Sequence, residues 1–160
     1  MVRKLKVYLD TSVISHLYAM DEPEKMADTL QLWKMFKADK YDVFLSQTTL
    51  DELAECGQPK RSKIASFLTE VQYTLLPSND AVVATAEKFI DFGVLKRKSY
   101  SDCLHIASAI VGGCDVILSW NFKHIVKHKT IAGAKAIALL EGRTELLIYA
   151  PSMLLEEEND

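Results

Sequence analysis

KVYLDTS, residues 6–12, is a short apolar run that ends in an aspartate, Asp10. Similar runs recur along the chain, as VFLS at residues 43–46 and VILSW at residues 116–120, with helical patterns between them. Short, strongly apolar strands separated by helices are typical of a parallel sheet that is covered by helices on both faces. The alternation therefore predicts an α/β fold around one central parallel sheet.

Capping residues and helix breakers mark the expected helix ends. Pro23 follows two acids as a helix start, Asn79 caps a later helix, and Gly93 stops it. Ser101 is the expected cap of the helix that contains Asp102. We expect strands at residues 4–9, 43–46, 72–76, 116–120 and 146–149, and helices at residues 49–56, 60–70, 80–92 and 102–111, after a first helix that begins at residue 23.

Four polar residues fall on one edge of this predicted sheet. Connections between parallel strands are right-handed and the covering helices run antiparallel to the strands, so strand carboxyl ends and helix amino ends share an edge. Ligands of open α/β sheets bind at that edge. Asp10 and Asn121 follow strands, and Glu52 and Asp102 lie in the first turns of helices. Asp115 begins its strand and therefore falls on the opposite edge.

Each of the four also has a purely structural interpretation. Asp10 and Asn121 suit turns, Glu52 forms a capping box with Thr49, and Asp102 suits the positive end of its helix dipole. Three carboxylates gathered at close range would nevertheless repel one another, and a divalent cation removes that cost. Oxygen ligands without cysteine suit Mg²⁺ or Mn²⁺ better than Zn²⁺. Such an ion can acidify a water and neutralise charge on a phosphoryl oxygen, so a phosphodiester is the natural substrate.

Composition supports one globular domain. The chain has 160 residues, 49% of them hydrophobic, and no apolar run approaches the length of about 20 residues that spans a bilayer. Residues 156–160 contain four acids and no base, so the net charge of −3 becomes +1 for the rest of the chain. We expect a domain at residues 1–151 and a frayed acidic tail at residues 152–160. With no targeting signal and no C-x-x-C spacing among its three cysteines, the chain is expected to be cytoplasmic with reduced thiols.

Four segments in order resemble the motifs of PIN-domain nucleases. They are LDTS at 9–12, SQTTLDELAE at 46–55, SDCLHIASA at 101–109 and CDVILSWNFKHI at 114–125. The resemblance extends to Tyr149-Ala150-Pro151, which is nearly the whole chain. It implies a three-layer α/β/α sandwich with a five-stranded parallel sheet. It also implies Mg²⁺- or Mn²⁺-dependent cleavage of single-stranded or structured RNA, with a 5′-phosphate and a 3′-hydroxyl on the products. Many small members are toxins of toxin–antitoxin pairs, often homodimers that a cognate antitoxin blocks.

The resemblance carries over residue by residue. Asp10, Glu52 and Asp102 match the three most regular acids of the family, so all three are expected to bind the metal, directly or through water. Ser12 and Ser119 match hydroxyl positions that support the site. The fourth acidic position of many members is Asn121 here, which offers an oxygen but no charge. This departure leaves open a catalytically weakened PIN module that binds RNA or a protein partner.

Other conspicuous residues lie near the motifs. His105 follows Asp102 by three positions and is expected to be a supporting or packing residue. Lys96, Arg97 and Lys98 precede Asp102 and are candidate contacts to an RNA backbone. The basic clusters at 60–63 and 124–129 suit solvated faces.

Two further enzyme or signalling classes fit less well. A haloacid-dehalogenase-like phosphatase needs a second aspartate two residues after Asp10, where this chain has Ser12. A receiver-like domain needs an aspartate after a middle strand and a lysine after a later one, where this chain has Gln47 and Asn121.

Overall fold

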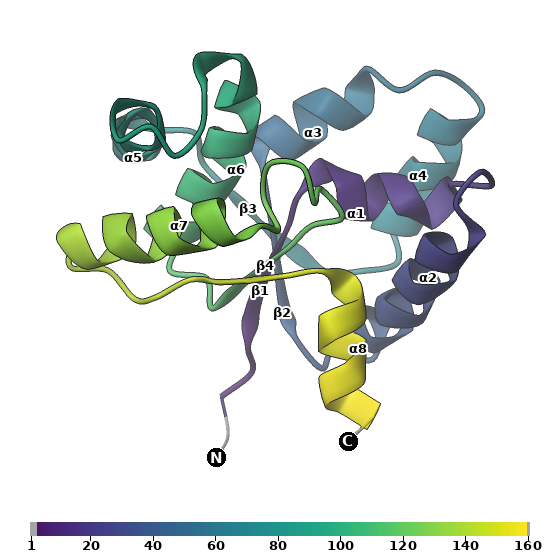
Figure 1. The fold of residues 1–160 in the computed structure, drawn as a ribbon. Coiled ribbons are helices and arrows are strands. Elements are labelled where there is room, and N and C mark those ends of the chain that lie inside the picture. The colour runs from purple at the N-terminus through teal and green to yellow at the C-terminus, as the bar shows by residue number, and fades with distance from the viewer. Residues whose placement is uncertain (1–2, 160) are drawn as a thin grey trace.

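Five parallel strands form the centre of the computed structural model, which describes residues 3–159 (Figure 1). The strand order is β3-β2-β1-β4-β5, so β1 lies in the middle of the sheet. The predicted five-stranded parallel sheet is confirmed. The strands are β1 (Lys6–Leu9), β2 (Asp42–Ser46), β3 (Tyr73–Leu76), β4 (Val116–Leu118) and β5 (Leu147–Tyr149).

Helices cover both faces of the sheet and complete the predicted three-layer sandwich. Those that pack on one face are α1 (Thr11–Ser15), α2 (Pro23–Lys37), α4 (Lys60–Leu68) and α8 (Pro151–Asn159). Those on the other face are α5 (Asp80–Asp91), α6 (Tyr100–Val111) and α7 (His128–Leu140). Helix α3 (Gln47–Ala54) follows β2 directly, and short 3₁₀ turns lie at η1 (His16–Tyr18) and η2 (Arg97–Ser99).

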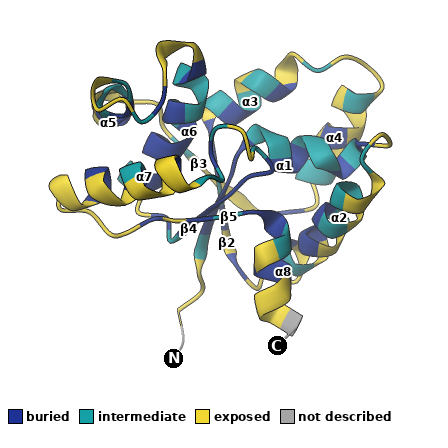
Figure 2. Cartoon of the chain, viewed as in Figure 1, coloured by how far each residue is buried: buried dark blue, intermediate teal, exposed yellow. Residues whose placement is uncertain are grey.

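The two cores follow from the alternation of side chains along each strand. Val7 and Leu9 belong to the core under α1 and α2, whereas Tyr8 belongs to the core under α5 and α6. All three side chains are fully buried. Figure 2 shows the same pattern, because the central strands β1 and β4 are buried and exposed residues lie on the outer sides of the helices. The side chains of β1 are apolar on both faces of the sheet because helices cover both faces.

Helix α7 was not expected from the sequence. Residues 128–140 begin with three polar residues and contain Gly133, which conceals the helical pattern. Its buried face consists of small side chains and one isoleucine: Thr130, Ala134, Ile137 and Ala138. A face of mostly small side chains gives a weak periodic signal, and its packing against the sheet is a tertiary effect.

The expectation of a frayed tail is wrong. Residues 151–159 form helix α8, and Leu154 and Leu155 are only 1% and 5% exposed within the first core. Tyr41 donates a hydrogen bond of 2.5 Å to Glu158. Glu156, Glu157 and Glu158 are exposed while the two leucines are buried, so amphipathic packing outweighs the local charge. The described part of α8 thus belongs to the same domain.

Along residues 3–159, no helix combines the length and the apolar composition that a bilayer crossing requires.

Replacing Leu154 by alanine tests whether α8 contributes to the core. Leu154→Ala is expected to lower the free energy of unfolding by about 2–5 kcal/mol, because it removes buried methyl groups and leaves a cavity. Met153→Ala, at a side chain that is 40% exposed, is the matched control and should have little effect. Urea denaturation followed by circular dichroism measures both. Equal stability of the two variants would show that α8 does not stabilise the domain.

Candidate metal centre

The structure brings all four predicted site residues to the carboxyl edge of the sheet. Asp10 follows β1 and is the N-cap of α1, and Asn121 lies shortly after β4. Asp102 lies in the first turn of α6, and Glu52 lies in α3, which begins directly after β2. In Figure 1 this is the upper edge, where α1, α3 and α6 meet. Asp115 lies at the opposite edge, where it pairs with Arg3 at 2.7 Å.

Asp10 is a buried carboxylate surrounded by neutral donors. Its side chain is 3% exposed. Oδ1 accepts hydrogen bonds from Ser12 Oγ at 2.6 Å and from the backbone N–H of Val13 at 3.2 Å, and Oδ2 accepts one from Ser119 Oγ at 2.5 Å. Burial raises the pKa of Asp10, although the attraction of His105 and these hydrogen bonds oppose the rise. The charged form is therefore held at an energetic cost.

The two serines join the ends of β1 and β4. Ser12 Oγ accepts a hydrogen bond from the backbone N–H of Trp120 at 2.9 Å, and Ser119 Oγ accepts one from that of Asn121 at 2.9 Å. Each serine hydroxyl thus accepts a hydrogen bond from a backbone N–H of the loop after β4 and donates one to the carboxylate of Asp10. This arrangement fixes the orientation of the carboxylate.

Glu52 has a very different environment. Oε1 accepts hydrogen bonds from Thr11 Oγ1 at 2.6 Å and pairs with His105 Nε2 at 2.5 Å, while Oε2 accepts one from Ser101 Oγ at 3.0 Å. Burial raises the pKa of Glu52, but the hydrogen bonds and the charge of His105 outweigh it and lower the pKa to about 2. The capping box, which was the purely structural alternative for Glu52, does not form, because α3 begins after Ser46 and Glu52 lies inside the helix.

His105 is held from the core. Its Nδ1 lies 2.7 Å from the hydroxyl of Tyr8, which lies 2.7 Å from Ser46 Oγ, and these three side chains are buried. A hydrogen-bonded path therefore runs from the middle of the sheet to Glu52. This agrees with the expected supporting role of His105. Tyr8, Thr11 and Ser101 were not expected to take part, although the last two lie beside predicted acids at the same edge.

Asp102 completes the group of acids. Burial raises its pKa, His124 and His105 oppose the rise, and the negative charges of Asp10 and Glu52 add to it. Asn121 Nδ2 donates a weak hydrogen bond to Oδ1 at 3.3 Å. Among the described residues, Oδ2 accepts no hydrogen bond. The negative charges of Asp10 and Glu52 thus act on the carboxylate of Asp102.

The donor set fits a hard divalent cation held by few direct ligands. Within residues 3–159, no three Asp, Glu, His or Cys side chains form a ready-made metal cluster. In the same range, neither Asp10 nor Asp102 pairs with a lysine or arginine, whereas Glu52 pairs with His105. Mg²⁺ takes one or two carboxylates directly and keeps several waters, so Asp10 and Asp102 could hold such an ion. Glu52 was expected to bind the metal as well, but hydrogen bonds already engage both of its carboxylate oxygens, so it would act on the ion through water or through its charge.

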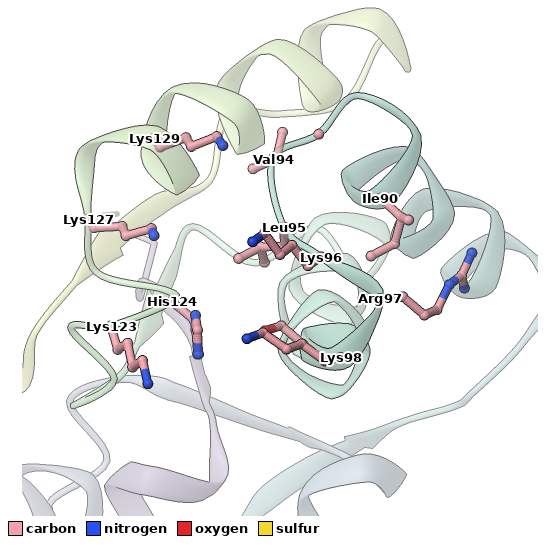
Figure 3. A pocket seen from close by; sticks show the side chains of 12 residues that line it. Ile90, Val94, Leu95, Lys96, Arg97, Lys98, Lys123, His124, Lys127 and Lys129 are labelled. Atoms are coloured by element: carbon pink, nitrogen blue, oxygen red, sulfur yellow. The ribbon is translucent and has the colours of Figure 1, made fainter.

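The basic residues before Asp102 separate into two groups. Arg97 makes a bidentate ion pair with Glu87 at 2.7 and 2.8 Å and lies over the ring of Tyr100. All three line a pocket beside the metal centre (Figure 3), but within residues 3–159 Lys96 and Lys98 make no ion pair. Arg97 is therefore already neutralised, and the two lysines remain available to an anion.

Comparison with known proteins agrees with this geometry. The sequence model of the PIN domain matches residues 7–124, which is more than half of the chain. The chain belongs to the PIN domain family. Members of this family are in general nucleases that depend on divalent metal ions. The match covers all four candidate site residues, from the end of β1 to the loop after β4.

A solved structure shows the same fold. It is described as the crystal structure of VapBC2 from Rickettsia felis bound to a DNA fragment from their promoter. The TM-score is 0.55 at 12% sequence identity, over 91% of this PIN domain chain and 98% of that chain. A search of curated protein sequences gives no significant match.

Replacing Tyr8 by phenylalanine tests the path that holds His105. Tyr8→Phe removes a buried hydroxyl and leaves His105 Nδ1 and Ser46 Oγ without this partner. We expect a loss of about 1–3 kcal/mol in the free energy of unfolding. Tyr73→Phe, on the exposed edge strand β3, is the control and should change little. Thermal unfolding of both variants measures the difference, and a Tyr8→Phe protein as stable as the control would contradict the described network.

Proposed function

We propose that this PIN domain is a Mg²⁺- or Mn²⁺-dependent endoribonuclease that hydrolyses RNA phosphodiester bonds. The observation that supports this most is the pair Asp10 and Asp102, two buried or half-buried acids with raised pKa values. In the described chain they have no lysine or arginine partner. They lie at the ligand-binding edge of the sheet, next to a pocket lined by lysines.

In this proposal Asp10 and Asp102 hold the cation, and Ser12 and Ser119 keep the Asp10 carboxylate in one orientation. When bound, the ion acidifies a water and neutralises charge on the phosphoryl oxygens. Glu52 stays ionised because His105 lowers its pKa, so it contributes constant negative charge beside the ion. Asn121 positions Asp102 through its amide. The water oxygen adds to phosphorus and the bond to O3′ breaks, which leaves a 5′-phosphate and a protonated 3′-hydroxyl.

Replacing Asp10 by asparagine separates the chemical role from the fold. Asp10→Asn should reduce RNA cleavage with Mn²⁺ by more than about 100-fold, because it removes a charged ligand worth several kcal/mol in the transition state. The same variant should raise the melting temperature of the metal-free protein at neutral pH. A raised folded-state pKa gives stability that is present below the ordinary aspartate pKa and is lost as pH rises through the raised value.

The control for this variant is Asp51→Asn, which neutralises an exposed neighbour of Glu52 that bonds only to Gln47 in the described structure. It should leave cleavage and metal-free stability nearly unchanged. Gel analysis of labelled RNA and differential scanning calorimetry in EDTA give the two measurements. If Asp10→Asn cut RNA as fast as the unaltered protein, the assignment of the site would be wrong.

A catalytically weakened module remains the second candidate, because Asn121 supplies no charge where many relatives have aspartate. Asn121→Asp adds a carboxylate beside Asp102. It should lower the Mn²⁺ concentration that gives half-maximal thermal stabilisation by at least about threefold, since hard cations favour carboxylate oxygens. Asn121→Ser is the control without added charge. Metal binding by the unaltered protein without cleavage of varied RNAs would favour the module over the enzyme.

We also propose that the protein is the toxin of a toxin–antitoxin pair, a homodimer in the cytoplasm that a cognate antitoxin blocks. The shared fold with a chain of the VapBC2 structure supports this proposal. A small neighbouring reading frame with a DNA-binding fold would agree with it. Without such a frame, and with no antitoxin recovered on co-expression of the flanking genes, a stand-alone nuclease would be the better description.

A further inference from the structure

The pocket beside the metal centre has a volume of about 610 Å³, within the range of roughly 300–1,000 Å³ that small-ligand sites occupy. Two segments that are distant in sequence line it, residues 90–99 and residues 123–129. Two of the residues that line the pocket, Ser99 and His124, lie next to residues of the metal centre. Ser99 is the N-cap of α6, which carries Asp102, and the backbone N–H of His124 donates to Asn121 Oδ1 at 2.9 Å. A chain that crosses the metal centre can therefore enter the pocket.

The rim of this pocket carries unbalanced positive charge. Apart from Arg97, which is paired with Glu87, the basic side chains that line the pocket make no ion pair with a carboxylate over residues 3–159. Figure 3 shows these unpaired basic side chains among those that line the pocket. These side chains are Lys96, Lys98, Lys123, His124, Lys127 and Lys129.

The start of α7 makes the arrangement more costly. Lys127 is the N-cap of α7 and Lys129 lies in its first turn, where no acidic residue is present. Helix amino ends carry partial positive charge and favour anions, so two lysines there oppose the dipole. Like charges around one hollow also repel one another. A bound polyanion relieves both costs.

The floor of the pocket is apolar. Ile90, Val94 and Leu95 line it, and Figure 3 labels all three among the lining side chains. Val94 approaches α7 closely at Gly133, where an added Cβ would lie 2.6 Å from both Val94 methyl groups. Inorganic phosphate would contact only the positively charged side chains at the rim of the pocket. A nucleotide uses both parts, because its base covers apolar side chains while its phosphates contact lysines.

We propose that this hollow, the nucleotide pocket, binds one unpaired nucleotide of the substrate strand next to the phosphodiester at the metal centre. The proposal rests on the proposed nuclease function and adds to it a binding site for the substrate strand, lined by residues 90–99 and 123–129. A base inside a duplex is stacked and paired and cannot reach Val94, so a paired strand contacts the rim alone.

The test measures binding in EDTA, where cleavage plays no part. The probe is a fluorescein-labelled RNA of about twelve nucleotides without self-complementarity, followed by anisotropy. Lys98→Gln combined with Lys127→Gln should weaken binding at least about fivefold. It should also reduce the slope of log affinity against log salt by about 1.4, since each phosphate contact to a single strand contributes about 0.7.

The matched control is Lys34→Gln combined with Lys63→Gln. These lysines lie on α2 and α4, on the other face of the sheet, and the charge change is the same. The control should bind like the unaltered protein. Both double variants should also melt like it, because all four side chains are exposed or half-buried. Annealing the probe to its complement should weaken binding by the unaltered protein at least about fivefold.

Three outcomes would overturn the proposal: equal weakening by the two double variants, equal affinity for single-stranded and annealed RNA, or no effect of the pocket variant. Stronger binding of an oligoglutamate peptide than of RNA, lost in the pocket variant, would assign the pocket to a protein partner instead. Pocket-dependent RNA binding without cleavage in Mn²⁺ would leave the nucleotide pocket in place and remove only the nuclease proposal.

Discussion

The buried carboxylate of Asp10, at the end of the central strand, constrains the arrangement around it. A buried charge is costly unless hydrogen bonds or an opposite charge compensate it. Here the compensation within the described chain comes from two serine hydroxyls and one backbone N–H. These donors come from α1 and from the loop after β4, so the carboxylate fixes two chain segments against each other. Hydrogen bonds without a positive partner leave a net cost, and this cost makes the site responsive to a cation.

Glu52 and Asp10 show how one edge of a sheet gives two acids different properties. Glu52 pairs with His105, which Tyr8 holds from the core, and its pKa falls to about 2. Asp10 has no such partner and its pKa rises. Both environments depend on β1, because Tyr8 points into one core and Asp10 ends the strand. Environments that separate the pKa values of neighbouring acids are characteristic of catalytic sites.

The negative metal centre and the positive nucleotide pocket lie side by side. The net charge of −3 conceals this separation, because the acids and lysines balance over the chain as a whole. Local fields steer charged ligands more than the total charge does. An RNA strand would be attracted to the lysines of the pocket and repelled by the acids until a cation balanced them. The two sites would therefore act together on one strand.

The sequence alone determined the parallel sheet and the position of the four polar residues on its carboxyl edge. Strand alternation, the handedness of crossovers and the caps around residues 79–93 carry that information locally. Tertiary structure decided the rest. It paired Glu52 with His105 and ruled out the alternative capping box with Thr49, because the helix begins at Gln47. Helix α7 could not be predicted because its buried side chains are mostly small. Helix α8 was predicted to be frayed because its sequence is rich in acids. Lys96 and Lys98 meet Lys127 only because α5 and α7 pack on the same face of the sheet, and no local pattern encodes such a contact between distant segments.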